Sequence, residues 1–314
     1  MAQSPYDSLG APPQALPAPR RGLPDALDNT VIDAVVRGAL EEDLGPGDVT
    51  TLGVVPEEAQ AEGVLLAKGE GVLAGLGVFA RVFELLDPSV SVSLDLADGD
   101  RVEAGLVVGR VKGPARSLLV GERTALNLLQ RLSGIAAVTA EYVERIAHVP
   151  GARILDTRKT TPGLRALQKY AVRCGGGENH RFGLFDEAMV KDNHVELAGR
   201  ELEGAVRDLR ASLGEGVRVT CEARDEAEAQ AAVRAGAHVV MLDNMTPAKI
   251  AGLLPGLRKL AIECAASVEF EASGGITLEN VAAYAEAGVE RISIGALTHS
   301  APSLDLSLKL RPVR

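Results

Sequence analysis

The sequence predicts an α/β protein in which a small N-terminal domain precedes a series of parallel βαβ units. The main observation is that strand-like and helix-like segments alternate after about residue 150, with a spacing of roughly 20–35 residues that is typical of βαβ units. The second observation is that residues 62–112 contain short alternating strands separated by turns, with little helix. About six βαβ units in a row favour a barrel or a large open sheet.

Composition restricts the class of protein. The chain has 314 residues, a net charge of −10 and three cysteines. The acidic balance argues against general nucleic-acid binding, and no uncharged apolar run approaches the roughly 18 residues of a membrane helix. Cysteines without a CxxC pair favour a reducing, cytoplasmic setting. Residues 1–28 are rich in Pro and Ala and lack an apolar signal core, so we expect a disordered tail.

The N-terminal half contains three predicted helices, at residues 30–42, 78–86 and 117–134. Asn29 or Thr30 is expected to cap the first helix, and a turn-rich loop at residues 43–51 follows it. The third helix carries a continuous apolar stripe, and Gly134 predicts its end. Together with the short strands, these helices form the predicted small α/β domain.

The second half contains six strand-like segments, at residues 152–157, 188–193, 217–223, 238–244, 268–276 and 291–300. Helix-like segments lie between them, at residues 163–174, 200–214, 225–237, 247–260 and 278–289. The active site of a barrel of this kind lies at the carboxyl ends of its strands. Every such end here carries polar or small residues: Asp156, Arg158, Lys159, Lys191, Asp192, His194, Glu222, Asp243, Asn244, Ser273, Gly274, Gly275, Gly295 and His299. The pattern places cations at the early ends and acids at the later ones, which favours a functional site there.

Positive charge is concentrated in residues 151–191, which contain eight cations against four acids. Arg165, Lys169 and Arg173 follow one another at intervals of four residues, and this spacing predicts an exposed helix face. The remaining cations at or near strand ends do not fit that explanation. They are Arg158, Lys159, Arg181 and Lys191.

The strand-end residues favour the binding of anions. Arginine suits carboxylates through two parallel hydrogen bonds, whereas lysine suits phosphate as a point charge. Glu222 and Asp243 can hold Mg²⁺ or stabilise a cationic transition state. The backbone N–H groups of the SGGI and SIGA turns can bind a phosphate. Together they predict a site for a sugar phosphate with several negative charges, a divalent metal and a carboxylated co-substrate.

Other site classes have weaker support. No serine triad, HExxH motif or P-loop can be assigned, and the spacing of His180, His194 and His299 matches no zinc pattern. Residues 75–80 (GLGVFA) match a dinucleotide-binding fingerprint, with Asp95 twenty residues after Gly75. The helix that follows is short, and no second nucleotide-binding half appears. An NAD-linked dehydrogenase is therefore a distant alternative, and Gly75 and Gly77 are expected to form a tight turn.

Seven motifs together resemble the quinolinate phosphoribosyltransferase family, and the resemblance spans Asn29 to Leu310. The motifs are EDLGPGDVTT, GERTALNLLQRLSGIA, DTRKTTPGLRALQKYAV, GGGENHRFGLFDEAMVKDNH, MLDNM, EASGGI and ISIGALTHS. One departure is visible, because family members often have alternating acids in the strand at residues 217–223. Here Thr220 precedes Glu222.

The resemblance implies an N-terminal α/β sandwich domain (29–132) followed by an incomplete, TIM-like α/β barrel (133–300), with residues 301–314 returning to the first domain. It also implies at least a homodimer in which Arg123 reaches the partner's barrel. The implied reaction joins quinolinate to 5-phosphoribosyl-1-pyrophosphate with Mg²⁺ and releases CO₂, in the biosynthesis of NAD. A related transferase that acts on another base is the alternative.

The resemblance also implies roles for individual residues. The carboxylates of quinolinate would be held by Arg123, Arg158, His180 and Arg181. Lys159 and Lys191 would contact pyrophosphate or carboxylate oxygens, and the 5-phosphate would lie on Ser273, Gly274 and Gly295. Glu222 and Asp243 would carry the catalysis and bind the metal, together with Lys159 as a catalytic cation. Asp156 and Asp192 either orient Arg158 and Lys191 or are structural, and Thr160 and Thr161 are expected to cap the next helix.

Overall fold

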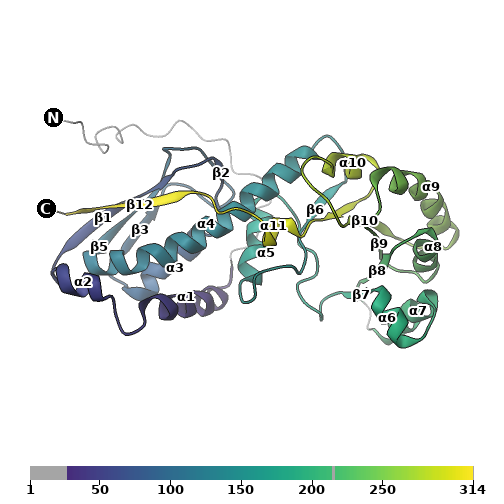
Figure 1. Cartoon of the computed structure of the whole chain (residues 1–314), viewed down its shortest axis with the longest axis horizontal. Coiled ribbons are helices and arrows are strands. Elements are labelled where there is room, and N and C mark those ends of the chain that lie inside the picture. The colour runs from purple at the N-terminus through teal and green to yellow at the C-terminus, as the bar shows by residue number, and fades with distance from the viewer. Residues whose placement is uncertain (1–26, 214–215, 314) are drawn as a thin grey trace.

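The computed structural model describes residues 27–213 and 216–313, and it shows two parts joined side by side (Figure 1). One part is built on an antiparallel sheet with helices on it, and the other is built on a parallel sheet. This arrangement confirms the predicted α/β class with a sheet domain before a barrel-like domain. The predicted tail comprises residues 1–28, and residues 1–26 of it lie outside the described part of the chain.

The N-terminal sheet has the strand order β12-β1-β5-β3. Its strands are β1 (Gln60–Ala67), β3 (Ser91–Leu94), β5 (Val107–Pro114) and β12 (Leu306–Pro312). All neighbours in it are antiparallel, and β12 pairs with β1 along its whole length, so the C-terminal segment lies in this first sheet (Figure 1). A two-stranded ribbon of β2 (Gly71–Val72) and β4 (Arg101–Val102) lies beside it.

Four helices belong to this part: α1 (Asn29–Leu44), α2 (Val49–Val54), α3 (Leu76–Leu86) and α4 (Ala115–Arg145). The cap of α1 is Asp28, whose side chain accepts a hydrogen bond from the Thr30 N–H group, so the prediction of Asn29 or Thr30 as cap was wrong by one or two residues. Asp48 caps α2 in the same way, which turns part of the predicted loop into helix.

The predicted end of the third helix was also wrong, because α4 continues through Gly134 as far as Arg145. A Cβ atom at Gly134 would come less than 3.0 Å from the carbonyl oxygen of Pro302. The glycine therefore allows the returning C-terminal segment to lie directly against the helix backbone. It serves close packing and does not end the helix.

The GLGVFA segment forms a turn and the start of a helix, without the parallel strands of a dinucleotide fold. Gly75 has a left-handed backbone at the N-cap of α3, as a tight turn requires. A Cβ atom there would also meet the side chain of Leu132. Gly77 lies within α3, so its predicted place in the turn was wrong.

The second part is a six-stranded parallel sheet with the order β6-β11-β10-β9-β8-β7. The strands are β6 (Arg153–Leu155), β7 (Ala188–Val190), β8 (Val219–Ala223), β9 (Val239–Asp243), β10 (Glu269–Ser273) and β11 (Arg291–Ser293). All six predicted strands are confirmed. No ladder joins β6 to β7 in the described residues, so the sheet curves like a barrel but stays open between them.

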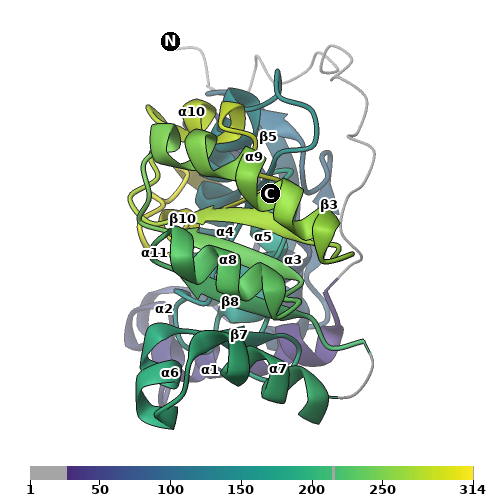
Figure 2. The ribbon, with the colours of Figure 1, turned by 90° about the vertical axis from the view of Figure 1, so that its right-hand side faces the viewer.

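Helices cover the outer side of this sheet, as Figure 2 shows for α8 and α9. The helices of this part are α5 (Arg165–Cys174), α6 (Asp192–Ala198), α7 (Leu202–Ser212), α8 (Glu226–Arg234), α9 (Pro247–Glu263), α10 (Val281–Glu286) and α11 (Ala296–His299). Most inward residues of the helices are Ala, Val and Leu, which fill a core with few aromatic side chains. Within the described ranges, no helix is long and apolar enough to cross a membrane.

Candidate active site

A cavity of about 520 Å³ lies at the carboxyl ends of the parallel strands. It collects nine of the eleven residues to which the resemblance assigns binding or catalysis: Arg158, Lys159, His180, Arg181, Lys191, Glu222, Asp243, Ser273 and Gly274. These residues come from six different segments of the chain. Their convergence follows from the topology, since the carboxyl ends of parallel strands meet at one edge of the sheet.

The two residues that do not line this cavity are Gly295 and Arg123. Gly295 lies just outside it, where a Cβ atom would come 2.9 Å from Cδ of Lys159, so the missing side chain leaves room for the lysine. Arg123 is exposed on α4, in the N-terminal part of the molecule. The cavity of a single chain is therefore built without Arg123.

Two carboxylates form the acidic wall of the cavity. Glu222 lies at the end of β8 and Asp243 at the end of β9, the neighbouring strand. Nζ of Lys191 donates a hydrogen bond to Oε2 of Glu222 at 2.7 Å. Burial raises the pKa of the Asp243 carboxyl, and the negative charge of Glu222 raises it further. The two acids thus repel each other and favour a cation between or beside them.

This pair of acids fits Mg²⁺ held mainly by substrate. Among the residues that the structure describes, no group of three or more His, Cys, Asp or Glu side chains could bind a metal by itself. Mg²⁺ is commonly held by one or two carboxylates together with phosphate oxygens of the substrate and water. Glu222 and Asp243 supply such a pair of hard oxygen donors.

Two arginines form the basic wall. Nε of Arg158 is buried and has no hydrogen-bond partner among the described residues. Burial lowers the pKa of the Arg181 guanidinium, and the like charge of Arg158 lowers it further. An unpaired buried donor and two adjacent cations are both stabilised by a bound anion with several oxygen atoms.

His180 is buried, and both of its ring nitrogens face groups of the protein. Nδ1 accepts a hydrogen bond from the N–H group of Arg181 at 2.7 Å. Nε2 lies 3.3 Å from Oε1 of Glu271, a fully buried carboxylate that also accepts hydrogen bonds from Arg291 and Ser293. The ring therefore connects the cavity wall to the polar interior of the barrel.

Asp156 and Lys169 form a buried ion pair that holds the segment carrying His180 and Arg181. Asp156 accepts hydrogen bonds from Nζ of Lys169, from the His180 N–H group at 2.9 Å and from Nδ2 of Asn179 at 2.6 Å. Nζ of Lys169 also donates to the His180 carbonyl at 2.9 Å. Burial raises the pKa of the Asp156 carboxyl and lowers that of the Lys169 ammonium group.

This pair corrects one interpretation of the sequence and selects the structural alternative for Asp156. Lys169 is 3% exposed, so the helix face predicted from the spacing of three cations does not include it. Asp156 contacts the 179–181 segment and has no hydrogen bond to Arg158. The spacing of the cations on α5 contains no information about Asp156, the buried acid that accepts a hydrogen bond from Lys169.

Asp192 lies 3.5 Å from Arg224, an ion pair that favours the structural alternative for this residue. The expectation that two threonines cap the next helix was wrong in detail. Thr160 accepts a hydrogen bond from Arg165, and Thr161 exchanges hydrogen bonds with Gln168. The threonines therefore bind side chains of α5, and the N-cap position itself is Leu164.

The cavity also includes residues that the sequence analysis did not single out: Thr157, Met189, Met241 and Ser293. Met189 and Met241 each precede a predicted site residue by two positions, and Ser293 precedes Gly295 by two. Alternate residues of a strand point to the same side of the sheet. Counting back two positions from each predicted site residue could therefore have identified Met189, Met241 and Ser293.

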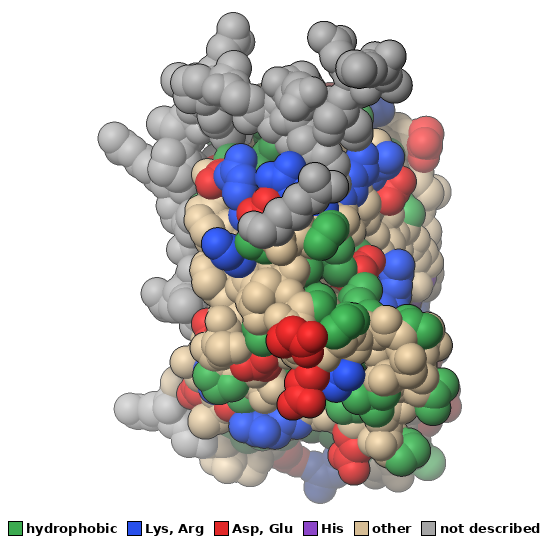
Figure 3. Space-filling model, turned by 90° about the vertical axis from the view of Figure 1, so that its left-hand side faces the viewer, with side chains coloured by type: hydrophobic (Ala, Val, Ile, Leu, Met, Phe, Trp, Pro, Cys, Tyr) green, Lys and Arg blue, Asp and Glu red, His purple; other side chains and the backbone are tan. Residues whose placement is uncertain are grey.

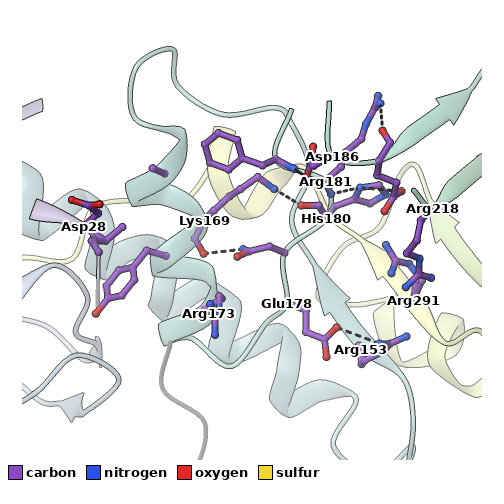
Figure 4. Close-up of a pocket in the computed structure, with 16 residues that line it drawn as sticks. Asp28, Arg153, Lys169, Arg173, Glu178, His180, Arg181, Asp186, Arg218 and Arg291 are labelled. Carbon is purple, nitrogen blue, oxygen red and sulfur yellow. Dashed lines mark hydrogen bonds and ion pairs between the residues drawn. The ribbon is translucent and has the colours of Figure 1, made fainter. Parts of the chain in front are cut away.

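A second cavity, of about 640 Å³, lies nearer the amino ends of the strands and α5 (Figure 4). It shares His180 and Arg181 with the first cavity. Its other arginines at strand starts are paired with acids, because Arg153 and Arg218 both contact Glu269 and Arg291 contacts Glu271. The smaller cavity, with the unpaired Arg158 donor and the strand-end carboxylates, is therefore the candidate active site.

Thr220 lies at a strand position where members of the family that the sequence resembles often have an acid. Its hydroxyl donates a hydrogen bond at 2.6 Å to Oε1 of Glu187, and both residues are buried in the barrel. Glu187 comes from the segment that follows Arg181 and precedes β7. A carboxylate is thus present beside this strand, but it comes from another part of the chain.

Comparison with known proteins agrees with this architecture. Residues 135–309 match the family profile described as quinolinate phosphoribosyl transferase, C-terminal domain, and residues 48–133 match the N-terminal domain of the same family. A probable nicotinate-nucleotide pyrophosphorylase [carboxylating] of Bacillus subtilis (strain 168) is 46% identical, over 85% of this chain and 89% of the relative. A protein with the same description from Synechocystis is 43% identical, over 94% of this chain and 96% of the relative.

Solved structures show the same likeness. NadC from Streptococcus pyogenes superposes with a TM-score of 0.84 at 40% identity, covering 93% of this chain and 100% of the other. The nicotinate-nucleotide pyrophosphorylase from Francisella tularensis has a TM-score of 0.84 at 35% identity, covering 91% of this chain and 98% of the other. With both domains matched and the strand-end cavity in place, the chain belongs to the quinolinate phosphoribosyltransferase family.

Proposed function

We propose that this protein transfers the phosphoribosyl group of 5-phosphoribosyl-1-pyrophosphate to quinolinate with loss of CO₂, giving nicotinate mononucleotide and pyrophosphate, a step of de novo NAD biosynthesis. The observation that carries this proposal is one cavity lined by both Arg158 and Arg181 and by the carboxylates of Glu222 and Asp243, with the buried Nε of Arg158 lacking a hydrogen-bond partner among the described residues. Quinolinate brings two adjacent carboxylates, which complement both arginines. Family membership supports the same substrate.

The cations of the cavity orient the two substrates. Arg158 and Arg181 hold the carboxylates of quinolinate, so that its ring nitrogen is directed toward C1 of the ribose. Lys159 and Lys191 contact oxygens of pyrophosphate or carboxylate. Backbone N–H groups at Gly274 and Gly295 hold the 5-phosphate together with Ser273. Positioning of this kind lowers a reaction barrier by several kcal/mol.

The acids act when the bond from C1 to pyrophosphate breaks. C1 then gains positive charge, and Glu222 and Asp243 face the cavity at the ends of adjacent strands, where they stabilise that charge. Glu222 and Asp243 would hold Mg²⁺, which when bound would supply positive charge to offset that of the departing pyrophosphate. Once the ring nitrogen is bonded to C1 it is cationic. The 2-carboxylate then leaves as CO₂, its electron pair stays at C2 beside the positive nitrogen, and a proton replaces it.

A direct assay tests this function. Purified protein is mixed with quinolinate, 5-phosphoribosyl-1-pyrophosphate and Mg²⁺, and nicotinate mononucleotide and CO₂ are measured. We expect both products in equal amounts. Product from nicotinate, with none from quinolinate, would instead assign the cavity to a related transferase that acts on another base.

We further propose that Arg123 completes the site of a second copy of the chain. Arg123 is exposed on α4 and does not line the cavity of its own chain. Leu119, one turn earlier on α4, is 40% exposed, and Val49, Leu52 and Val54 are exposed on α2. Hydrophobic side chains are visible on this end of the molecule (Figure 3). Apolar surface of this kind is typical of an interface between copies.

Mixed dimers test the role of Arg123. Arg123→Ala and Arg158→Ala chains are each expected to be almost inactive alone. In a heterodimer, one of the two sites combines an intact Arg158 with the partner's intact Arg123. A random mixture should therefore regain about a quarter of the wild-type activity. Confirmed heterodimers without any regained activity would show that Arg123 does not act across the interface.

A further inference from the structure

Glu271 places a carboxylate inside the barrel, where apolar side chains such as Val, Ile and Leu usually lie. It belongs to β10 and precedes Ser273 by two residues, so alternation puts both side chains on one face of the sheet. The side chain is 0% exposed. Burial of a carboxylate is costly unless other groups pair with it. The groups that offset this cost therefore indicate what the carboxylate does.

Three side chains surround the Glu271 carboxylate. Nε of Arg291 on the neighbouring strand β11 donates a hydrogen bond to Oε2 at 2.7 Å. The Ser293 hydroxyl donates to Oε1, and Nε2 of His180 lies 3.3 Å from the same oxygen. This last contact is close without being a well-aligned hydrogen bond, because the buried Nε2 has no hydrogen-bond partner among the described residues. Arg291 thus balances the charge of the carboxylate, while Oε1 faces the histidine.

The other ring nitrogen of His180 decides where the ring proton lies. Nδ1 accepts a hydrogen bond from the Arg181 N–H group at 2.7 Å, and a nitrogen that accepts in this way carries no proton. Oε1 of Glu187 is farther away, 4.0 Å from Nδ1, and it already accepts from the Thr220 hydroxyl. The proton of the neutral ring therefore lies on Nε2, which faces Oε1 of Glu271. The negative carboxylate favours this tautomer.

Arg181 lies at the other end of this chain of contacts. Nη1 donates to the Glu187 carbonyl at 3.1 Å, and Nη2 lies 3.6 Å from Sδ of Met189. The side chain is half-buried and lines the cavity, while its backbone N–H group is held by His180. Two parallel hydrogen bonds from a guanidinium to a carboxylate require a defined direction of the side chain. The backbone contact with His180 contributes to that direction.

We propose that Glu271 is a positioning residue for the quinolinate site: it holds His180 in the tautomer with the proton on Nε2, so that Nδ1 can fix the backbone of Arg181, whose guanidinium binds a substrate carboxylate. This inference rests on the proposed function, because that function gives Arg181 its role. Glu271 does not line the cavity. It therefore acts through His180.

The first test is Glu271→Gln, which keeps the shape of the side chain. A guanidinium has donors only, so the glutamine oxygen must face Arg291 and its NH2 group must face His180. The NH2 group then donates to Nε2, the ring proton moves to Nδ1, and the hydrogen bond from Arg181 is lost. We expect Kd and KM for quinolinate to rise about tenfold. The acids of the cavity are untouched, so kcat should fall by less than about threefold.

Two double variants distinguish positioning from a structural role of the buried ion pair. Arg291→Met is combined with Glu271→Gln in one and with Glu271→Leu in the other, so neither leaves a buried charge without its partner. In the glutamine variant the side-chain oxygen is free to face His180, whereas leucine offers no acceptor. We expect quinolinate Kd within about twofold of wild type for glutamine and about tenfold weaker for leucine. A structural role alone predicts the same Kd for both.

Glu269→Gln is the matched control. Glu269 lies two residues earlier on β10 and pairs with Arg153 and Arg218, away from His180. The same chemical change there should leave the quinolinate Kd unchanged. Binding of 5-phosphoribosyl-1-pyrophosphate should be unchanged in every variant, because Glu271 and His180 are not among its proposed ligands.

The ¹⁵N chemical shifts of the His180 ring, assigned through His180→Asn, report the tautomer without any substrate. We expect the proton on Nε2 in the wild type and in the double variant with glutamine, and on Nδ1 in Glu271→Gln. Wild-type protein with this tautomer that neither binds nor converts quinolinate would overturn the proposed function alone. Active wild-type protein with the proton on Nδ1, or equal quinolinate Kd values for the two double variants, would overturn the inference alone.

Discussion

Lys169→Met is expected to lower the free energy of unfolding by about 3–5 kcal/mol, because it leaves the buried Asp156 carboxylate without its cation. Both side chains are almost inaccessible, at 4% for Lys169 and 0% for Asp156. Methionine has a similar length, so little volume is lost. Chemical denaturation at neutral pH, compared with the wild type, measures the difference.

The matched control for this variant is Lys259→Met on α9. Lys259 is 79% exposed and lies 3.9 Å from Glu263, so its loss should change the free energy of unfolding by less than about 0.5 kcal/mol. Lys169→Met should also reduce activity beyond its effect on stability, because Lys169 contacts the carbonyl of His180 in the segment that carries Arg181. Equal stabilities of the two variants would show that the buried pair contributes little.

The regular elements of this molecule were predictable because their signals are local. The strand–helix alternation after residue 150 depends on patterns within single segments, and all six predicted strands are present. The convergence of Arg158, Glu222 and Asp243 was also predictable, since parallel topology alone brings strand ends together. Periodicity and topology are sufficient for this part of the site.

The errors occurred where the role of a residue depends on a partner that is distant in the sequence. Gly134 has the appearance of a helix end, but its role depends on Pro302, which lies far away in the sequence. Lys169 has the spacing of an exposed cation, but Asp156 and the segment at residues 179–181 bury it. No local pattern contains these contacts, because each is created by the fold.

Glu222→Gln is expected to reduce kcat by about 100- to 1000-fold, the usual effect of removing one electrostatic contact to a transition state. The change keeps the shape of the side chain and removes its charge, so the positive charge that develops at C1 loses one of its two facing carboxylates. Quinolinate affinity should change much less, since its proposed ligands are Arg158 and Arg181. Steady-state kinetics gives kcat, and calorimetric titration with quinolinate gives the Kd.

The loss of the Glu222 charge also affects Lys191. The same two measurements, kcat and Kd, separate this effect from the loss of transition-state stabilisation. Nζ of Lys191 donates to Oε2 of Glu222, so the neutral glutamine leaves Lys191 with a weaker partner and freer to bind an anion. This effect would tighten anion binding, whereas loss of transition-state stabilisation lowers kcat. Glu228→Gln is the control, because Glu228 pairs with Arg224 at 2.7 Å on α8 outside the cavity. A Glu222→Gln enzyme with the kcat of this control would place Glu222 outside the catalytic step and leave it as a partner of Lys191 alone.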